Sequence, residues 1–453
     1  MNIKPILTGK LNKVDNRFYT LMGHTGDIEN LSFAEYSVLK KMDGFRTMQD
    51  ISDETNIPID NVDKIYRSFN GNKKVSNLHN WNKIKWCKRC QVHFAGERCE
   101  LCNEKGKKIM FSPPCDPFIA FSKERKFILN VLQDKFNVLL PENTLFLVNN
   151  GVYNNIFFWE VEYCGEIVLK MEFIGAKQDT WKYTLMVKKE MIRNEDYLFN
   201  QETKALLCRA SRNHMEKITK KSVAIIAETS TFFVDKPLLY FSAGKESMVI
   251  YNLLKKANIS ANIITVITGV EFPEDIYFMK EMKQIIDKDE MFKYYFYEEN
   301  GNKIIEALNT KKKLSAKEPW CRVDFKRKLK NRGTEEIYCG KDFVAYEGSR
   351  WYENDFRRRH PIVNFISDYN HQVWVHPLAE WTSYELWIYT FQQNLMVNPL
   401  YYKGFQRTTC WLCPVVNPFH LYCSQEQYQD LWKMLKGCEL DAFGDDKTKD
   451  LPF

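Results

Sequence analysis

The chain of 453 residues contains no apolar run close to the ~18 residues that are needed to cross a bilayer. Residues 1–5 lack the apolar stretch of a secretory signal. No internal repeat and no low-complexity tract is found along the chain. These absences exclude a membrane-spanning protein and a repeat array, and they predict a cytoplasmic protein without a membrane partner.

Cysteine, by contrast, is abundant, with thirteen residues in the chain. In a reducing compartment many cysteines indicate ligands or catalysts rather than disulfides. A hydrophobic fraction of 44% and a charged fraction of 27% are typical of a folded globular protein. The length exceeds what one hydrophobic core usually supports, so several domains are expected.

The net charge of +7 is small for this length, but positive charge is concentrated in residues 311–332. Only Glu318 and Asp324 oppose the positive residues of this segment, which are Lys311, Lys312, Lys313, Lys317, Arg322, Lys326, Arg327, Lys328, Lys330 and Arg332. One interpretation is a solvated basic helix. The other is a patch for phosphate groups, either of a nucleotide or of a nucleic acid backbone.

The pattern along the chain predicts a multidomain α/β protein with four parts. Residues 1–82 form a helical module that resembles a winged helix, with Ser32 and Glu35 spaced as a capping box. Residues 83–112 form a zinc ribbon, and the proline-rich segment 113–117 is expected to be a linker. Residues 120–200 form a small, mainly β domain that resembles the RNA-binding PUA-like barrels. Residues 201–453 form an α/β domain with a doubly wound parallel sheet.

A phosphate-binding loop is predicted where the apolar strand 237–241 meets a helix that continues to about residue 257. Small residues let backbone N–H groups approach an anion, and the helix N-terminus contributes its positive dipole end. The loop consists of Ser242, Ala243, Gly244, Lys245, Glu246 and Ser247. Its length does not fit the Walker A pattern, which has four residues between its first Gly and the Gly-Lys pair.

The loop and three later segments together resemble the phosphoadenosine phosphosulfate (PAPS) reductase family of the PP-loop, adenine nucleotide alpha hydrolase superfamily. The later segments are 268–274, which starts with Thr268 and Gly269, 347–353, which contains Arg350, and 376–414, which ends in a Cys-Trp-Leu-Cys-Pro motif. The resemblance implies a HUP-like parallel sheet that binds ATP with Mg²⁺ over residues 242–247. It also implies that adenine rests near Thr268 and Gly269, and that Lys245 and Arg350 stabilise the anionic groups during catalysis.

The sequence departs from this family at two loop positions and at its end. Ala243 and Glu246 replace the usual second Gly and Asp, and Ala is restricted at positive φ. Residues 446–453 lack the Glu-Cys-Gly-(Leu/Ile)-His tail whose cysteine takes sulfite in the thioredoxin-linked reductases. Reduction of a sulfonucleotide is therefore the less favoured hypothesis.

Two sets of cysteines are candidates for metal sites. Cys87, Cys90, Cys99 and Cys102 form two Cys-x-x-Cys pairs separated by eight residues, a spacing typical of a structural Zn²⁺ site. The second set is Cys410, Cys413 and Cys423, which the resemblance joins with Cys321 around a [4Fe–4S] cluster. A second zinc ion and free, buried cysteines are the alternatives, and Cys339 or Cys438 are alternative fourth ligands.

The leading hypothesis is an ATP-pyrophosphatase-type sulfurtransferase that adenylates a nucleic acid, tRNA or DNA, and then inserts sulfur from a donor protein. The first alternative is a reductase of phosphoadenylyl or adenylyl sulfate that produces sulfite. The second is a nucleic-acid-binding protein without catalytic activity.

Overall fold

The computed structural model describes residues 3–13, 19–22, 28–71, 74–77, 81, 83–153, 156–175, 178–192, 197–311, 313–315, 320–364, 371–408, 410–435 and 439–441. Cys438, Lys312, Lys317, Glu318 and residues 446–453, which enter the arguments above, lie outside these ranges. Within them, no helix is both long and apolar enough to cross a membrane.

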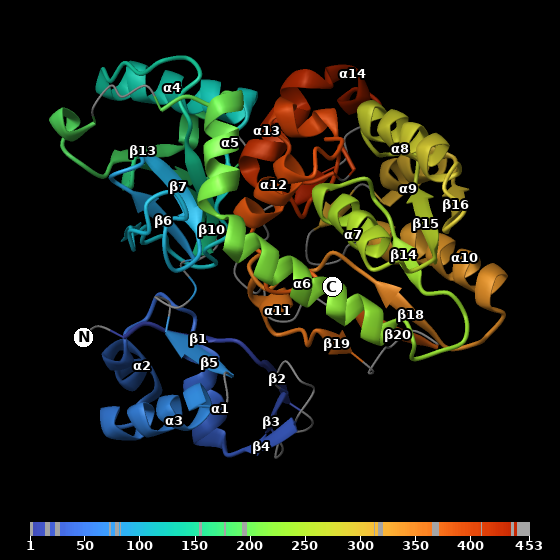
Figure 1. Cartoon of the computed structure of the whole chain (residues 1–453), viewed down its shortest axis with the longest axis horizontal. Coiled ribbons are helices and arrows are strands. Elements are labelled where there is room, and N and C mark those ends of the chain that lie inside the picture. The colour runs from blue at the N-terminus through green and yellow to red at the C-terminus, as the bar shows by residue number, and fades with distance from the viewer. Residues whose placement is uncertain are drawn as a thin grey trace.

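The N-terminal module has a hydrophobic core of its own, and its helices and strands form a separate lobe in Figure 1, drawn in blue. Its helices are α1 (Phe33–Lys41), α2 (Met48–Thr55) and α3 (Ile59–Gly71). Strands β1 (Pro5–Leu7) and β5 (Val75–Asn77) pair with each other, and β2 (Lys10–Lys13), β3 (Tyr19–Met22) and β4 (Ile28–Leu31) form an antiparallel sheet. The predicted capping box is present, because the Ser32 hydroxyl accepts from the Glu35 N–H and Glu35 accepts from the Ser32 N–H.

Residues 84–185 form two antiparallel sheets. The first has the order β7-β6-β8, with β6 at Ile84–Cys87, β7 at Val92–Ala95 and β8 at Lys107–Lys108. The second has the order β13-β12-β11-β10-β9, with β9 at Phe118–Ile119, β10 at Leu147–Tyr153, β11 at Ile156–Tyr163, β12 at Glu166–Phe173 and β13 at Lys182–Leu185. Helix α4 (Ser122–Phe136) packs against β13. This part of the chain is mainly β, as the sequence predicts.

The segment 113–117 contains no helix or strand, as its prolines predict, and it packs against the β domain. Pro113, Cys115 and Pro117 are buried. The preceding Ser112 donates to Glu160 through its N–H at 2.7 Å and its hydroxyl at 2.6 Å, which fixes the segment to β11. Because its backbone is held in this way, the segment carries Asp116 to a defined position beside the C-terminal domain.

Residues 201–229 form two consecutive helices, α5 (Gln201–Ala210) and α6 (Arg212–Thr229). Ser211 between them has a φ of −109° and a ψ of 9°, outside the helical region, and its hydroxyl accepts the Ala95 N–H at 3.1 Å. In Figure 1 these helices, drawn in green, run from the β-rich part of the molecule to the C-terminal sheet.

The C-terminal domain contains a six-stranded sheet with the order β16-β15-β14-β18-β20-β19. Its strands are β14 (Leu238–Tyr240), β15 (Ala261–Ile267), β16 (Phe292–Glu298), β18 (Phe343–Tyr346), β19 (Val363–Asn364) and β20 (Gln372–Val375). All pairs are parallel except β19 with β20. The order reverses between β14 and β18, so the carboxyl end of β14 is the switch point at which such sheets bind ligands.

Both faces of this sheet are covered, which explains its short apolar strands. On one face Leu238, Ile264 and Phe343 share a core with Leu329 and Tyr338 of α10 (Lys328–Tyr338). The alternate strand residues belong to the main core on the other face. The remaining helices are α7 (Lys245–Lys256), α8 (Pro273–Ile286), α9 (Gly301–Lys311), α11 (Asp355–Arg358), α12 (Ser383–Gln392), α13 (Pro418–Gln427) and α14 (Gln429–Trp432). Strands β17 (Lys313–Ser315) and β21 (Glu439–Asp441) form a separate parallel pair.

Candidate functional site

The predicted phosphate loop lies at the switch point, directly after β14 and before α7. Gly244 is the N-cap of α7, and a Cβ at this position would lie 2.7 Å from the Thr408 hydroxyl, so only glycine fits without a shift of that neighbour. Ala243 is fully buried with a φ of +53°, in the left-handed region where a Cβ causes strain. The replacement of glycine by Ala243 therefore keeps the shape of the loop at the expense of backbone strain.

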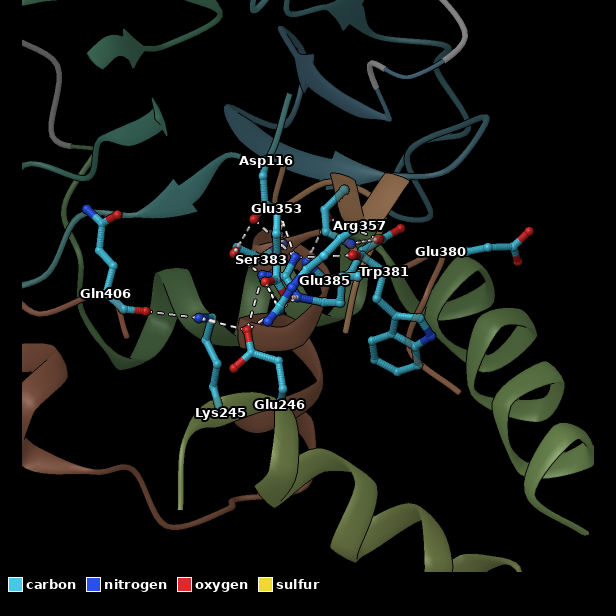
Figure 2. A network of polar contacts seen from close by, with 12 residues as sticks. Asp116, Lys245, Glu246, Glu353, Arg357, Glu380, Trp381, Ser383, Glu385 and Gln406 are labelled. Atoms are coloured by element: carbon cyan, nitrogen blue, oxygen red, sulfur yellow. Dashed lines mark hydrogen bonds and ion pairs between the residues drawn. The ribbon is translucent and has the colours of Figure 1, made fainter. Parts of the chain in front are cut away.

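Lys245 is the first residue of α7, and its side chain is held in the wall of a cavity. Its backbone N–H donates to the Tyr401 hydroxyl at 2.8 Å. Its Nζ donates to the Gln406 carbonyl oxygen at 3.0 Å and lies 2.9 Å from Glu246 Oε1. Figure 2 shows Lys245 between these two partners. Lys245 is only 8% exposed, and it is one of the residues that line the cavity.

Arg350 lies in a network of carboxylates beside the loop and is 2% exposed. Its guanidinium contacts Asp116 at 2.9 Å, Glu246 at 3.1 Å and Glu353 at 3.5 Å. The predicted contact of Arg350 with a nucleotide's anionic groups stays a prediction, because in this structure its donors are directed at protein carboxylates. Its present role is to connect the phosphate loop to distant segments.

Asp116 is a member of this network that sequence reasoning missed. It accepts from the Ser383 N–H at 2.6 Å and from the Ser383 hydroxyl at 2.9 Å, at the start of α12, while it also contacts Arg350. Its only sequence signal was its place in a proline-rich segment. Figure 2 shows Asp116 and Ser383 on the far side of the network from Lys245.

Glu246, which stands where the family has Asp, balances the charges of the loop. Burial alone would raise the pKa of Glu246, but Lys245 and Arg350 outweigh this effect and lower the pKa to about 2. A Cβ on Gly348 would lie 2.4 Å from the Glu246 Cβ, so Gly348 leaves room for the Glu246 side chain. Glu246 is therefore ionised at neutral pH and neutralises part of the positive charge of Lys245.

The Thr268–Gly269 segment after β15 is arranged around Glu271. The Thr268 N–H donates to Glu271 at 2.9 Å, the Thr268 hydroxyl at 2.8 Å and the Gly269 N–H at 3.0 Å. Glu271 lines the cavity, whereas Thr268 and Gly269 do not. Their predicted contact with adenine is not tested by this arrangement and stays a prediction.

A cavity of about 920 Å³ lies over the loop and is lined from several parts of the chain. Lining residues from the loop are Ser242, Lys245, Glu246 and Ser247. The N-terminal module contributes Asp43, Phe45 and Arg46, and the β domain contributes residues 150–153 and Phe157. The volume is at the upper end of the about 300–1,000 Å³ that is usual for ligand pockets. The cavity is therefore large enough for a nucleotide and part of a second molecule.

The first cysteine set converges as the spacing predicts. The sulfur atoms of Cys87, Cys90, Cys99 and Cys102 all lie within 4.8 Å of one another, and this is the one such group among the described residues. Four sulfurs at about 2.3 Å from a tetrahedral ion would lie about 3.8 Å apart, and Cys87 Sγ and Cys102 Sγ are 3.4 Å apart. The set can hold a metal ion, and Zn²⁺ stays the predicted one.

The knuckle formed by residues 84–102 contacts both neighbouring domains. His93 Nδ1 lies 2.8 Å from the Tyr197 hydroxyl, and His93 Nε2 lies 2.6 Å from Glu162, with both side chains fully buried. The Tyr384 hydroxyl of α12 donates to the His93 carbonyl oxygen at 3.1 Å. The knuckle is thus part of the joint between the β domain and the C-terminal domain.

In the second cysteine set, Cys321, Cys410 and Cys413 are electrostatic neighbours of one another, and the predicted iron–sulfur ligand set, which adds Cys423, stays a prediction. Burial, followed by the nearby Cys413 thiol, raises the pKa of Cys321 to about 11. Cys423, however, is fully buried on α13, and its sulfur lies 2.9 Å from where a Gly404 Cβ would be. Cys423 follows Phe419 by one helical turn, and Phe419 packs on Phe127 and Trp159, so this face of α13 is turned toward the β domain.

Comparison with known proteins agrees with this geometry. Residues 236–416 match the family model described as the phosphoadenosine phosphosulfate reductase domain. An uncharacterized protein of Methanocaldococcus jannaschii is 21% identical over 440 residues, which cover 77% of this chain and 90% of the relative. Sulfate adenylyltransferase subunit 2 of Shewanella sp. (strain ANA-3) is 26% identical over 223 residues, which cover 42% of this chain and 68% of the relative.

Among solved structures, phosphoadenylyl-sulfate reductase from Candida auris, in a phosphate complex, is similar at 14% identity with a TM-score of 0.34. The similarity covers 44% of this chain and 96% of that protein.

Proposed function

Because residues 236–416 form a domain of the PAPS reductase family, we propose that the chain is an enzyme that cleaves ATP between its α- and β-phosphates. The acceptor is an oxygen atom of a nucleic acid, which takes AMP as pyrophosphate leaves. Sulfur that a donor protein carries as a thiocarboxylate then attacks the activated carbon or phosphorus. AMP departs with the former acceptor oxygen, and water cleaves the carbon–sulfur bond to the donor.

The single observation that supports this proposal most is the position of Lys245. Its ammonium group lies at the positive end of α7, at the switch point of a parallel sheet and in the wall of the cavity. Gln406 and Glu246 hold it in place without burying it beyond reach of the cavity. A triphosphate bound there, with its Mg²⁺, would take the place of part of the Glu246 contact.

The residues around Lys245 would act mainly through charge and orientation. Lys245 stabilises the charge that develops on the leaving pyrophosphate. The exposed Ser242 hydroxyl lies at the edge of the loop and can donate to a phosphate oxygen. Arg350 keeps Glu246 in position through its contact at 3.1 Å, and a direct contact of Arg350 with the nucleotide is the further part of this proposal.

The knuckle would hold Zn²⁺ through Cys87, Cys90, Cys99 and Cys102, which supports the joint between domains and takes no part in the chemistry. The iron–sulfur cluster on Cys321, Cys410, Cys413 and Cys423 stays a prediction, and no step is assigned to it.

The test is product analysis with labelled ATP and single-stranded nucleic acid as acceptor. From the wild type we expect pyrophosphate and an acceptor that carries AMP, with free AMP only after the sulfur donor is added. The rate in Lys245→Gln should fall at least about 100-fold, as expected when a charge that stabilises the transition state is removed. Lys255→Gln is the matched control, because Lys255 lies on the same helix, is exposed and pairs with Asp289. Release of ADP and phosphate instead, or equal rates in both variants, would contradict the proposal.

The family match itself favours a second candidate, reductive cleavage of a sulfonucleotide in the same cavity. Incubation with phosphoadenylyl sulfate and a dithiol reductant separates the two, because the reductase would form sulfite and the proposed enzyme would not.

A further inference from the structure

A row of positive side chains faces the cavity from the helix after residue 320. Arg322, Lys326 and Lys330 follow one another at intervals of four, along the π-helix Arg322–Arg327 and the start of α10. Lys326 and Lys330 line the cavity. The Lys330 ammonium lies 4.0 Å from the centre of the Tyr240 ring, which fixes it against the end of β14.

Two further cations, Arg357 and Arg407, line the same cavity. Arg357 pairs with Glu353, whereas neither Lys326 nor Arg407 forms an ion pair with any residue in the described ranges.

Glu347, which follows β18, interacts with Lys330, and Glu271 and Asp275 also line the cavity. Burial raises the pKa of Asp275 to about 8, so this carboxyl is largely protonated near neutral pH and adds little negative charge beside Lys326.

The charged side chains of this row lie close enough to shift one another's pKa values. Burial lowers the pKa of Lys330 to about 8, with Glu347 opposing the change and Lys326 and Arg322 adding to it. Burial also lowers the pKa of Arg322, and Arg357 and Arg407 contribute to that shift. Like charges held together raise the free energy of the folded protein unless an anion occupies the space between them.

Aromatic rings form another part of the lining of the same cavity. Phe45 of the N-terminal module stacks on Tyr153 of β10, with ring centres 4.3 Å apart and planes inclined by 30°. Both residues line the cavity, and Tyr153 is 38% exposed. Basic groups that follow a backbone, together with aromatic rings on which bases stack, are the two elements by which proteins hold single-stranded nucleic acid.

We propose that Lys326, Lys330 and Arg407 bind backbone phosphates of a single-stranded nucleic acid, while one of its bases stacks on Tyr153. The inference rests on the proposed function in one respect, namely that the bound strand is the acceptor. The bound strand would lie in the cavity that Lys245 lines. Binding itself needs no ATP.

The segment 311–332 thus divides into two kinds of residue. Lys328 and Arg332 do not line the cavity, and Arg332 pairs with Glu336 on the exposed side of α10. Lys328 is exposed like Lys326 and lies two positions away. Lys328→Gln therefore removes the same charge from the same helix at a position outside the cavity, which makes it a matched control.

The experiment measures binding of a labelled single-stranded oligonucleotide of mixed sequence to the full chain without ATP, by fluorescence anisotropy over a range of salt concentrations. We expect Lys326→Gln and Arg407→Gln each to weaken binding about 3- to 10-fold and to lower the slope of log K against log salt by about one phosphate contact. Tyr153→Ala should weaken binding by about 5-fold or more, as for loss of one stacked base. Lys328→Gln should change affinity by less than about twofold.

Equal losses of oligonucleotide affinity in Lys326→Gln and Lys328→Gln would overturn the proposal. The positive charge of the helix would then attract the oligonucleotide regardless of whether the residue lines the cavity. Calorimetry with inorganic phosphate tests the small-anion alternative, and uptake of phosphate without oligonucleotide binding would also overturn it. Selective loss in Lys326→Gln would support this inference even if no pyrophosphate were released, so its failure and that of the proposed function can be told apart.

Discussion

The knuckle at residues 84–102 and the C-terminal region around Cys410 are held together by different means. In the knuckle, four thiols converge within 4.8 Å, and one metal ion can complete the structure. Around Cys410, the cysteines are divided between the cavity side and the buried face of α13, and the ion pairs of Arg350, Glu246 and Asp116 hold the neighbouring segments. The stability of the first region should depend on metal, and that of the second on charge.

The largest expected effect is the loss of the metal site in Cys99→Ser. Zinc binding to small folded units has an apparent free energy of about 10–16 kcal/mol, and the buried Cys99 lies in the joint between domains. We expect loss of the bound metal and of more than about 3 kcal/mol of stability, measured by metal analysis and chemical unfolding.

Cys423→Ala is the control, because Cys423 is equally buried but belongs to the second set. It should keep its metal and lose about 1 kcal/mol, as is usual for a point substitution. Equal metal loss in the two variants would remove the distinction between the two regions.

Arg350→Gln should be next in size. Removal of one partner of a buried ion pair typically destabilises by about 3–5 kcal/mol, and here Asp116 and Glu246 would lose their shared cation. Chemical unfolding should show this loss without loss of metal. Arg332→Gln, an exposed ion-pair variant, should stay within about 0.5 kcal/mol. Similar losses of stability in the two variants would mean that the buried ion pairs of Arg350 do not stabilise the C-terminal region.

Acid should affect the C-terminal network in a defined pH range. Although burial opposes it, the neighbouring Lys245 and Arg350 lower the pKa of Glu246 to about 2. Because the folded pKa lies below the unfolded value of about 4.3, this contribution is complete above pH 5 and is lost as the pH falls toward 2. Between pH 5 and 3 the loss should be about 2 kcal/mol.

Unfolding curves at several pH values test this expectation, with Glu246→Gln as the comparison. The variant should be less stable at pH 7 and should lose less stability on acidification than the wild type. Parallel curves for the two proteins would show that Glu246 does not carry the acid sensitivity.

The smallest effect is expected for Ala243→Gly in the phosphate loop. Relief of the positive φ contributes about 1–2 kcal/mol, whereas the greater freedom of glycine in the unfolded chain offsets about 0.5–1 kcal/mol. The net change in thermal stability should stay below about 1 kcal/mol, with the rate of pyrophosphate release retained. A loss of stability of more than about 2 kcal/mol would mean that packing of the Ala243 methyl group stabilises the fold more than the positive φ destabilises it.

The sequence was sufficient for features whose residues lie close together along the chain. The four knuckle cysteines are separated by short turns, so their spacing alone predicts convergence. The apolar strand predicted at residues 237–241 is present as β14 (Leu238–Tyr240), because a buried parallel strand is a continuous apolar run. The phosphate loop was recognised for the same local reason.

The partners of that loop were not predictable in this way. Asp116 reaches Arg350 across 234 positions, and Tyr401 reaches the Lys245 N–H across 156. Tyr401 lies in the segment 376–414 that carries the resemblance, but nothing in the sequence assigned it to the Lys245 N–H. The packing of α13 is also a long-range feature, since Phe419, one helical turn before Cys423, packs on Phe127 and Trp159 of the β domain.

The amino-acid sequence by itself therefore determined the metal-ligand knuckle, the parallel strands and the glycine-capped loop at the start of α7, since each depends on interactions within a few tens of residues. Only the tertiary structure decided which carboxylates surround Arg350, which cations face the cavity and which cysteines meet. These depend on how the domains pack, and that packing is set by the burial of apolar surface over the whole chain.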